Sequence, residues 1–140
     1  IDSVVLLDGL HCGYQNGSLN ELQIGAFIDF ARLAAAGSKL MFVSHSSIIP
    51  PGYASTTETA NFLIYKLGGR AQSAAARPSD PMGLELISRF SKGNFQVRGF
   101  SGNDKMDHCA HVGFYRDVLK LYVKPRWNSP RGYAASAAAK

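Results

Sequence analysis

The chain has 140 residues, of which 46% are hydrophobic and 18% are charged, and its formal net charge is +5. This balance excludes an intrinsically disordered chain, which combines low hydrophobicity with high charge density. No apolar run approaches the roughly 20 residues that a membrane-spanning helix needs, so no membrane span is expected. The length fits one domain, which we place at residues 1–133, and the alanine-rich end over residues 134–140 predicts a flexible tail.

The basic residues are spread along the chain. A nucleic-acid surface gathers them on one face with aromatic side chains between them. Only one mild cluster stands out, at Lys120, Lys124, Arg126 and Arg131. The charge therefore indicates a solvated basic surface and argues against nucleic acid as a partner. Binding of an anionic polymer would be supported by charge alone.

The chain begins with a predicted strand and helix. Residues 4–7 are an apolar run rich in β-branched side chains, which is typical of a parallel strand buried on both faces. Residues 10–17 read as a loop. Ser18 and Glu21 then have the spacing of a capping box, which predicts a helix from about residue 19 to residue 36 that ends at Gly37.

A second strand and helix follow with the same layout. Residues 40–43 predict another buried strand, which ends in a polar run over residues 44–47. The capping-box spacing recurs at residues 55–58, where it begins the next helix. Two glycines at residues 68–69 end that helix.

The second half predicts a hairpin and a last helix. Residues 70–83 are small and polar and contain proline, which indicates a surface loop. Residues 84–90 and 95–100 alternate as two strands of a hairpin. A helix is expected over residues 112–123, ended by Pro125. Its expected apolar stripe is Val112, Tyr115, Val118, Leu119 and Tyr122. The element order predicts an α/β fold with a mostly parallel sheet and flanking helices.

Polar side chains gather where these strands end. Ligand sites in such sheets lie beyond the carboxyl ends of the strands. The candidates at this rim are Asp8, His11, residues 44–47, Asp107, His108 and His111.

Three segments carry a resemblance to a known family. They are VVLLDGLH at residues 4–11, the strand, loop and helix over residues 39–69, and the strand, loop and helix over residues 93–123. In this order they resemble the C-terminal half of an α/β-hydrolase. The domain over residues 1–133 would then be half of a larger one, and its missing N-terminal half would be a partner. The resemblance implies hydrolysis of an ester or amide bond in a small-molecule or polymer substrate, without a cofactor.

The chain departs from the family pattern at two places. The nucleophile elbow G-x-S-x-G is absent, so the resemblance implies a serine upstream of this chain and an inactive chain on its own. The run Ser44-His45-Ser46-Ser47 lacks the acid that usually follows its strand. In some family members the acid lies one strand earlier, which is the position of Asp8.

Asp8 and His108 are therefore the candidate acid and base, with His111 as the alternative base. A triad acid orients the imidazole and stabilises its protonated form. We expect Asp8 and His108 to approach within roughly 2.6–3.2 Å. The structural alternatives are an Asp8 that binds loop amides and a His108 that caps the last helix.

Other rim residues are expected to line a substrate pocket. They are His11, Ser44, His45 and Ser46. The histidines lack the tight spacing of a zinc site, so no metal is expected. Cys12 and Cys109 are poor candidates for a nucleophile, although a disulfide between them becomes possible if Asp8 meets His108.

Overall fold

The computed structural model of the protein describes residues 1–78 and 83–129, so the predicted tail lies outside the described residues. Its main feature is a five-stranded sheet with the order β1-β4-β7-β6-β5. The strands are β1 (Ser3–Leu7), β4 (Leu40–His45), β5 (Gln72–Pro78), β6 (Glu85–Lys92) and β7 (Phe95–Phe100). The first three in spatial order run parallel, and β6 and β5 are antiparallel to their neighbours. The fold is thus α/β with a mixed sheet whose centre is parallel.

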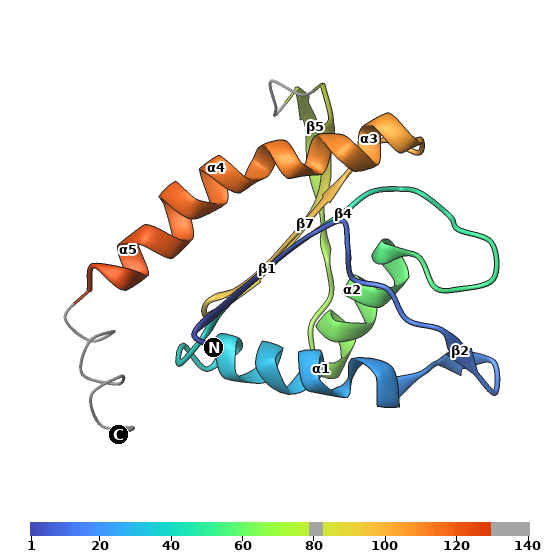
Figure 1. Ribbon diagram of the computed structural model, residues 1–140, viewed down its shortest axis with the longest axis horizontal. Helices are drawn as coiled ribbons and strands as arrows, with labels where there is room; N and C mark the ends of the chain where they lie inside the picture. Colours follow the sequence, from blue (N-terminus) through green and yellow to red (C-terminus); the bar gives the residue numbers. More distant parts are fainter. Residues whose placement is uncertain (79–82, 130–140) are drawn as a thin grey trace.

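Helices cover both faces of this sheet (Figure 1). The helices α1 (Glu21–Ala35) and α2 (Thr56–Lys66) lie on one face. A C-terminal helical segment over residues 105–127 crosses the other face. It consists of α3 (Lys105–Ala110), η1 (His111–Phe114), α4 (Tyr115–Val118), η2 (Leu119–Val123) and α5 (Lys124–Trp127). None of the helices among the described residues combines the length and apolar character needed to cross a membrane.

Strand β4 divides the core between the two faces. All six of its residues are buried. Met41 and Val43 belong to the apolar cluster on the side of α1 and α2, whereas Leu40 and Phe42 belong to the cluster under the C-terminal helical segment. This alternation is the period of two that every strand imposes.

Strand β1 is confirmed at the predicted position, but its expected burial on both faces is wrong. All five of its residues are half-buried. The reason is its place at the edge of the sheet, where only β4 pairs with it among the described residues.

The predicted loop before α1 contains a small hairpin. Strands β2 (Tyr14–Gln15) and β3 (Ser18–Leu19) pair across Asn16 and Gly17, whose φ angles of 52° and 77° are those of a tight hairpin turn. Ser18 is therefore in a strand and does not cap α1. Asn20 caps it instead, because its side chain accepts a hydrogen bond of 3.1 Å from the amide of Leu22.

The second predicted capping box is confirmed at α2. Ser55 Oγ accepts from the amide of Glu58 at 3.1 Å, and Glu58 Oε2 accepts from the amide of Ser55 at 2.8 Å. These bonds satisfy two amides that the first turn of a helix leaves free. They also fix where α2 begins, next to the carboxyl ends of β1 and β4.

The hairpin of β6 and β7 is confirmed, but the predicted loop over residues 70–83 is wrong in part. It contains β5, which pairs with the outer side of β6. An edge strand tolerates residues with low strand propensity, such as the alanines and the proline of β5, because a neighbouring strand pairs with only one of its sides. Residues 79–82 of that predicted loop lie outside the described residues.

The last helical segment is longer than expected in both directions. It begins at Lys105 because Asp104 and Asp107 form a capping box, and it continues through Pro125 into α5. A π-helical turn, η2, ends at Val123, two residues before Pro125. Its wider turn departs from the α-helical hydrogen-bond pattern that a proline cannot join. The changes of helical pitch also shift the buried face, so Val112 and Tyr115 of the expected stripe are exposed.

Candidate functional site

Asp8 occupies the first position after β1. Its φ angle is 51°, a left-handed conformation that costs a non-glycine residue about 1–2 kcal/mol. Its amide donates to the carbonyl of Ser44 at 3.0 Å, which joins the end of β1 to the end of β4. The side chain is 1% exposed. A buried carboxylate on a strained backbone needs strong partners, and the neighbouring elements supply them.

Three donors surround the carboxylate of Asp8. Oδ1 accepts from the amide of Ser46 at 2.8 Å and from Thr56 Oγ1 at 2.6 Å, and Oδ2 lies 2.8 Å from His108 Nδ1. Burial by itself raises the pKa of Asp8, but the hydrogen bonds from Thr56, His108 and Ser46 outweigh it and lower the pKa below its usual range. Asp8 is therefore an ionised carboxylate at neutral pH.

His108 reaches Asp8 from the second turn of α3. The Asp104–Asp107 capping box sets the start of this helix and so the position of His108. Because an ionised carboxylate can only accept, Nδ1 of His108 carries the proton in their contact. In the tautomer with a single proton on Nδ1, the lone pair of the ring is on Nε2. The side chain of His108 is 48% exposed, and the residue lines a pocket.

Asp8 and His108 line a pocket of about 380 Å³ at the carboxyl ends of β1 and β4. Its other walls include His11, Ser46, Tyr53 and Lys105. The rings of His11 and Tyr53 meet edge to face with centroids 5.4 Å apart. A neutral imidazole held by a buried carboxylate beside a pocket can accept a proton from a bound group and return it, which is general base and acid chemistry.

The predicted approach of Asp8 to His108 is confirmed, whereas the alternative base, His111, lies apart from the pocket. His111 is fully buried, and its Nδ1 lies 2.8 Å from Ser44 Oγ. Burial lowers its pKa, against a smaller opposing effect of the Asp8 carboxylate. Its Nε2 has no hydrogen-bond partner among the described residues.

The predicted pocket residues divide among three places. His11 and Ser46 line the pocket with Asp8 and His108, but Ser44 and His45 do not. Ser44 faces the C-terminal helical segment, where it contacts His111. His45 faces α2, where its Nδ1 lies 2.8 Å from Thr57 Oγ1. Successive residues of β4 point to opposite faces, so adjacent residues at its end cannot share one pocket.

The cysteines do not pair. Both are free, Cys12 buried and Cys109 exposed. Cys12 Sγ lies 3.8 Å from Thr59 Oγ1, on the side of α2. Neither cysteine lines the pocket of Asp8 and His108. Within residues 1–78 and 83–129, no three histidine, cysteine or acidic side chains are grouped so as to hold a metal ion.

Sequence reasoning missed Thr56, which makes the shortest hydrogen bond to Asp8. Thr56 is the first residue of α2, directly after the capping residue Ser55. The capping box located this position along the chain. No sequence signal indicated that the first turn of α2 would lie against the end of β1.

No match came from the comparisons with known proteins, whether with family models, curated proteins or solved structures. The candidate site therefore stands on its own geometry.

Proposed function

We propose that this chain is the part of an α/β-hydrolase-type serine hydrolase that carries the acid and the base of the catalytic triad. Asp8 is the acid and His108 is the base. The nucleophilic serine comes from a segment outside this chain, and the substrate is an ester or an amide. The observation that carries the proposal is the 2.8 Å contact between Asp8 Oδ2 and His108 Nδ1 on the wall of one pocket.

In this reaction His108 Nε2 takes the proton of the serine hydroxyl as the serine oxygen attacks the carbonyl carbon. The same nitrogen then returns the proton to the leaving alcohol or amine. Asp8 stays ionised throughout and stabilises the imidazolium. The hydrogen bonds from Thr56 and Ser46 to its other oxygen favour that ionised form.

The edge position of β1 supports the location of the missing segment. One side of β1 pairs with β4, and no described strand pairs with the other side. An edge with unpaired backbone groups readily accepts another strand. A parallel strand added there would end at the same edge of the sheet as Asp8, so a serine directly after it would lie at the edge that also holds His108.

A second candidate function is a binding module without chemistry. The observation in its favour is that none of the described serine, threonine or cysteine side chains forms a hydrogen bond with His108 Nε2. The two functions differ in one requirement, because only the hydrolase needs a nucleophile that His108 activates.

A fluorophosphonate probe distinguishes them, since it reacts covalently only with an activated serine. The test uses the longer protein that the proposal requires. We expect one labelled serine outside residues 1–140, and we expect His108→Ala to abolish the labelling. Cys109→Ala is the matched control, because Cys109 is the exposed neighbour of His108 and lines no part of the pocket. A longer protein that folds but takes up no label would support the binding module.

A further inference from the structure

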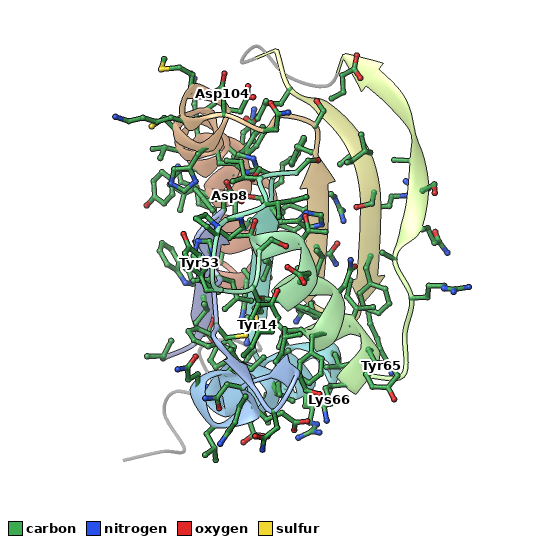
Figure 2. The ribbon with its side chains drawn as sticks, turned by 90° about the vertical axis from the view of Figure 1, so that its right-hand side faces the viewer. Asp8, Tyr14, Tyr53, Tyr65, Lys66 and Asp104 are labelled. Carbon is green, nitrogen blue, oxygen red and sulfur yellow. The ribbon has the colours of Figure 1, made fainter. Side chains whose placement is uncertain are left out.

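A second pocket, of about 480 Å³, lies next to the first. Ile48, Pro50 and Tyr53 line both pockets, so the loop after β4 forms the wall between them. Figure 2 shows Tyr53 between Asp8, which lines the first pocket, and Tyr14, which lines the second. The proposed hydrolysis uses no residue that belongs to the second pocket alone.

His45 is a buried polar group of this second pocket. Its side chain belongs to a residue that is 3% exposed, and it lines the pocket from the end of β4. Thr57 Oγ1 lies 2.5 Å from the carbonyl oxygen of Ser46 and 2.8 Å from His45 Nδ1. Because a carbonyl only accepts, the hydroxyl proton of Thr57 goes to Ser46, and Thr57 Oγ1 accepts from the Nδ1–H of His45.

The other nitrogen of His45 is therefore an acceptor. Burial lowers the pKa of His45, against smaller opposing effects of the Ser46 carbonyl and Asp8, so the ring is neutral at neutral pH. Nε2 then holds a lone pair. No side chain in the described part of the chain donates a hydrogen bond to it. A hydrogen-bond donor from outside the protein would stabilise this acceptor.

Ser88 lies beside His45 above a glycine. A Cβ atom added to Gly99 of β7 would lie 2.2 Å from Ser88 Oγ, 2.4 Å from His45 Cε1 and 2.6 Å from His45 Nε2. Any other residue at position 99 would therefore clash with both side chains and force them to move. The pairing of β6 with β7 shifts by one residue between Leu86 and Ser88. The side chains of β6 change face there, since Leu86 packs under the C-terminal helical segment and Phe90 packs on the side of α1 and α2.

We propose that the pocket of His45 and Ser88 is a binding site for a neutral apolar molecule that carries a hydroxyl group. The hydroxyl donates to His45 Nε2 and accepts from Ser88 Oγ. The apolar body lies against Ile48, Ile49 and Ile87, which line the same pocket. The pocket does not favour a cationic ligand. Its one carboxylate among the lining residues, that of Glu58, already accepts hydrogen bonds from Tyr14 and Ser55.

The test compares two ligands that differ in one hydroxyl, 4-ethylphenol and ethylbenzene. We expect the phenol to bind the 140-residue chain about fivefold to 150-fold more tightly, which is the usual net gain from two hydrogen bonds. The ¹⁵N resonance of His45 Nε2 should move on addition of the phenol and stay unchanged with ethylbenzene. This binding test needs no catalytic activity, so its outcome is independent of the hydrolase proposal.

Three variants assign the effect to these residues. His45→Phe keeps an aromatic ring and removes the acceptor, so the preference for the phenol should fall to the contribution of Ser88. Ser88→Ala should reduce the preference for the phenol, and it remains informative if His45→Phe does not fold. Gly99→Ala should weaken both ligands. Ser91→Ala is the matched control in β6, because Ser91 is exposed and lines neither pocket. Equal affinity of the two ligands for the unaltered chain, or a response at His11 or His108 in place of His45, would overturn the proposal.

Discussion

The carboxylate of Asp8 lies 2.8 Å from the imidazole of His108, although 100 positions separate the two residues in the chain. Two different elements create the contact, since Asp8 ends β1 and His108 belongs to α3. Because Asp8 is ionised and can only accept, the proton of this hydrogen bond is on Nδ1 of His108. This arrangement makes Nε2 the nitrogen that faces other molecules.

Asp8→Asn should reverse the tautomer of His108. The amide group of asparagine can donate to Nδ1, which favours the ring with its proton on Nε2. ¹⁵N NMR of the imidazole distinguishes the two forms directly. In the unaltered chain we expect the proton on Nδ1, and in the variant on Nε2. The same tautomer in both proteins would contradict the contact.

Thr56→Val should destabilise the fold. Valine keeps the shape of threonine but removes the hydroxyl that donates to Asp8 Oδ1 at 2.6 Å. A hydrogen bond to a charged group contributes about 1.5–3 kcal/mol, so the free energy of unfolding should fall by about that amount. Urea denaturation measures it. Thr56→Ser is the control, because it keeps the hydroxyl and should retain most of the stability.

The start of α1 offers a paired test. Asn20→Ala removes the side chain that accepts from the amide of Leu22, and it should lower the free energy of unfolding by about 1 kcal/mol. Ser18→Ala should change it little, since Ser18 belongs to the short strand β3. Thermal unfolding of both variants provides the comparison. A larger loss of stability in Ser18→Ala than in Asn20→Ala would contradict this assignment and would support Ser18 as the capping residue.

Stability should decrease as the pH falls below about 6.5, the ordinary pKa of histidine in an unfolded chain. His45 and His111 are buried, and their pKa values in the fold are lowered. Below pH 6.5 these two histidines bind protons in the unfolded chain but stay neutral in the folded chain. Lowering the pH therefore favours unfolding. Each histidine contributes a slope of at most about 1.4 kcal/mol per pH unit.

The variant His111→Phe tests whether His111 contributes to this pH dependence of stability. Phenylalanine is buried without a charge at any pH, so the dependence between pH 6.5 and 5 should become shallower. Urea denaturation across this range gives the slope for both proteins. Asp8 adds a separate loss at lower pH, because its lowered pKa gives stability that is present above about 3.9 and disappears as the pH falls through its value in the fold. An unchanged slope between pH 6.5 and 5 in His111→Phe would contradict the assignment to this residue.

Much of the site followed from the order of the elements. The apolar run before Asp8 and the polar run after β4 placed both at one rim, because parallel strands end on the same side of a sheet. The same rule brought His108 to that rim. The positions of Ser44 and His45 on opposite faces of the sheet could also have been predicted, because adjacent residues of a strand point to opposite faces.

Other features depended on packing that no local pattern carries. The contact of Thr56 with Asp8 requires α2 to begin against the end of β1. The small residues of β5 give no strand signal, because pairing with β6 rather than propensity holds them. The hairpin of β2 and β3 did have a local signal in Asn16 and Gly17, two residues that favour left-handed turns.

The most direct test of the central claim is the rate of ester hydrolysis by the longer protein, compared between His108→Ala and His111→Ala. The account predicts a loss of about a thousandfold or more in kcat for His108→Ala, since a triad base is removed, and a loss of about tenfold at most for His111→Ala. It also predicts no turnover by the 140-residue chain alone. Equal losses for the two variants, or clear turnover by the isolated chain, would contradict it.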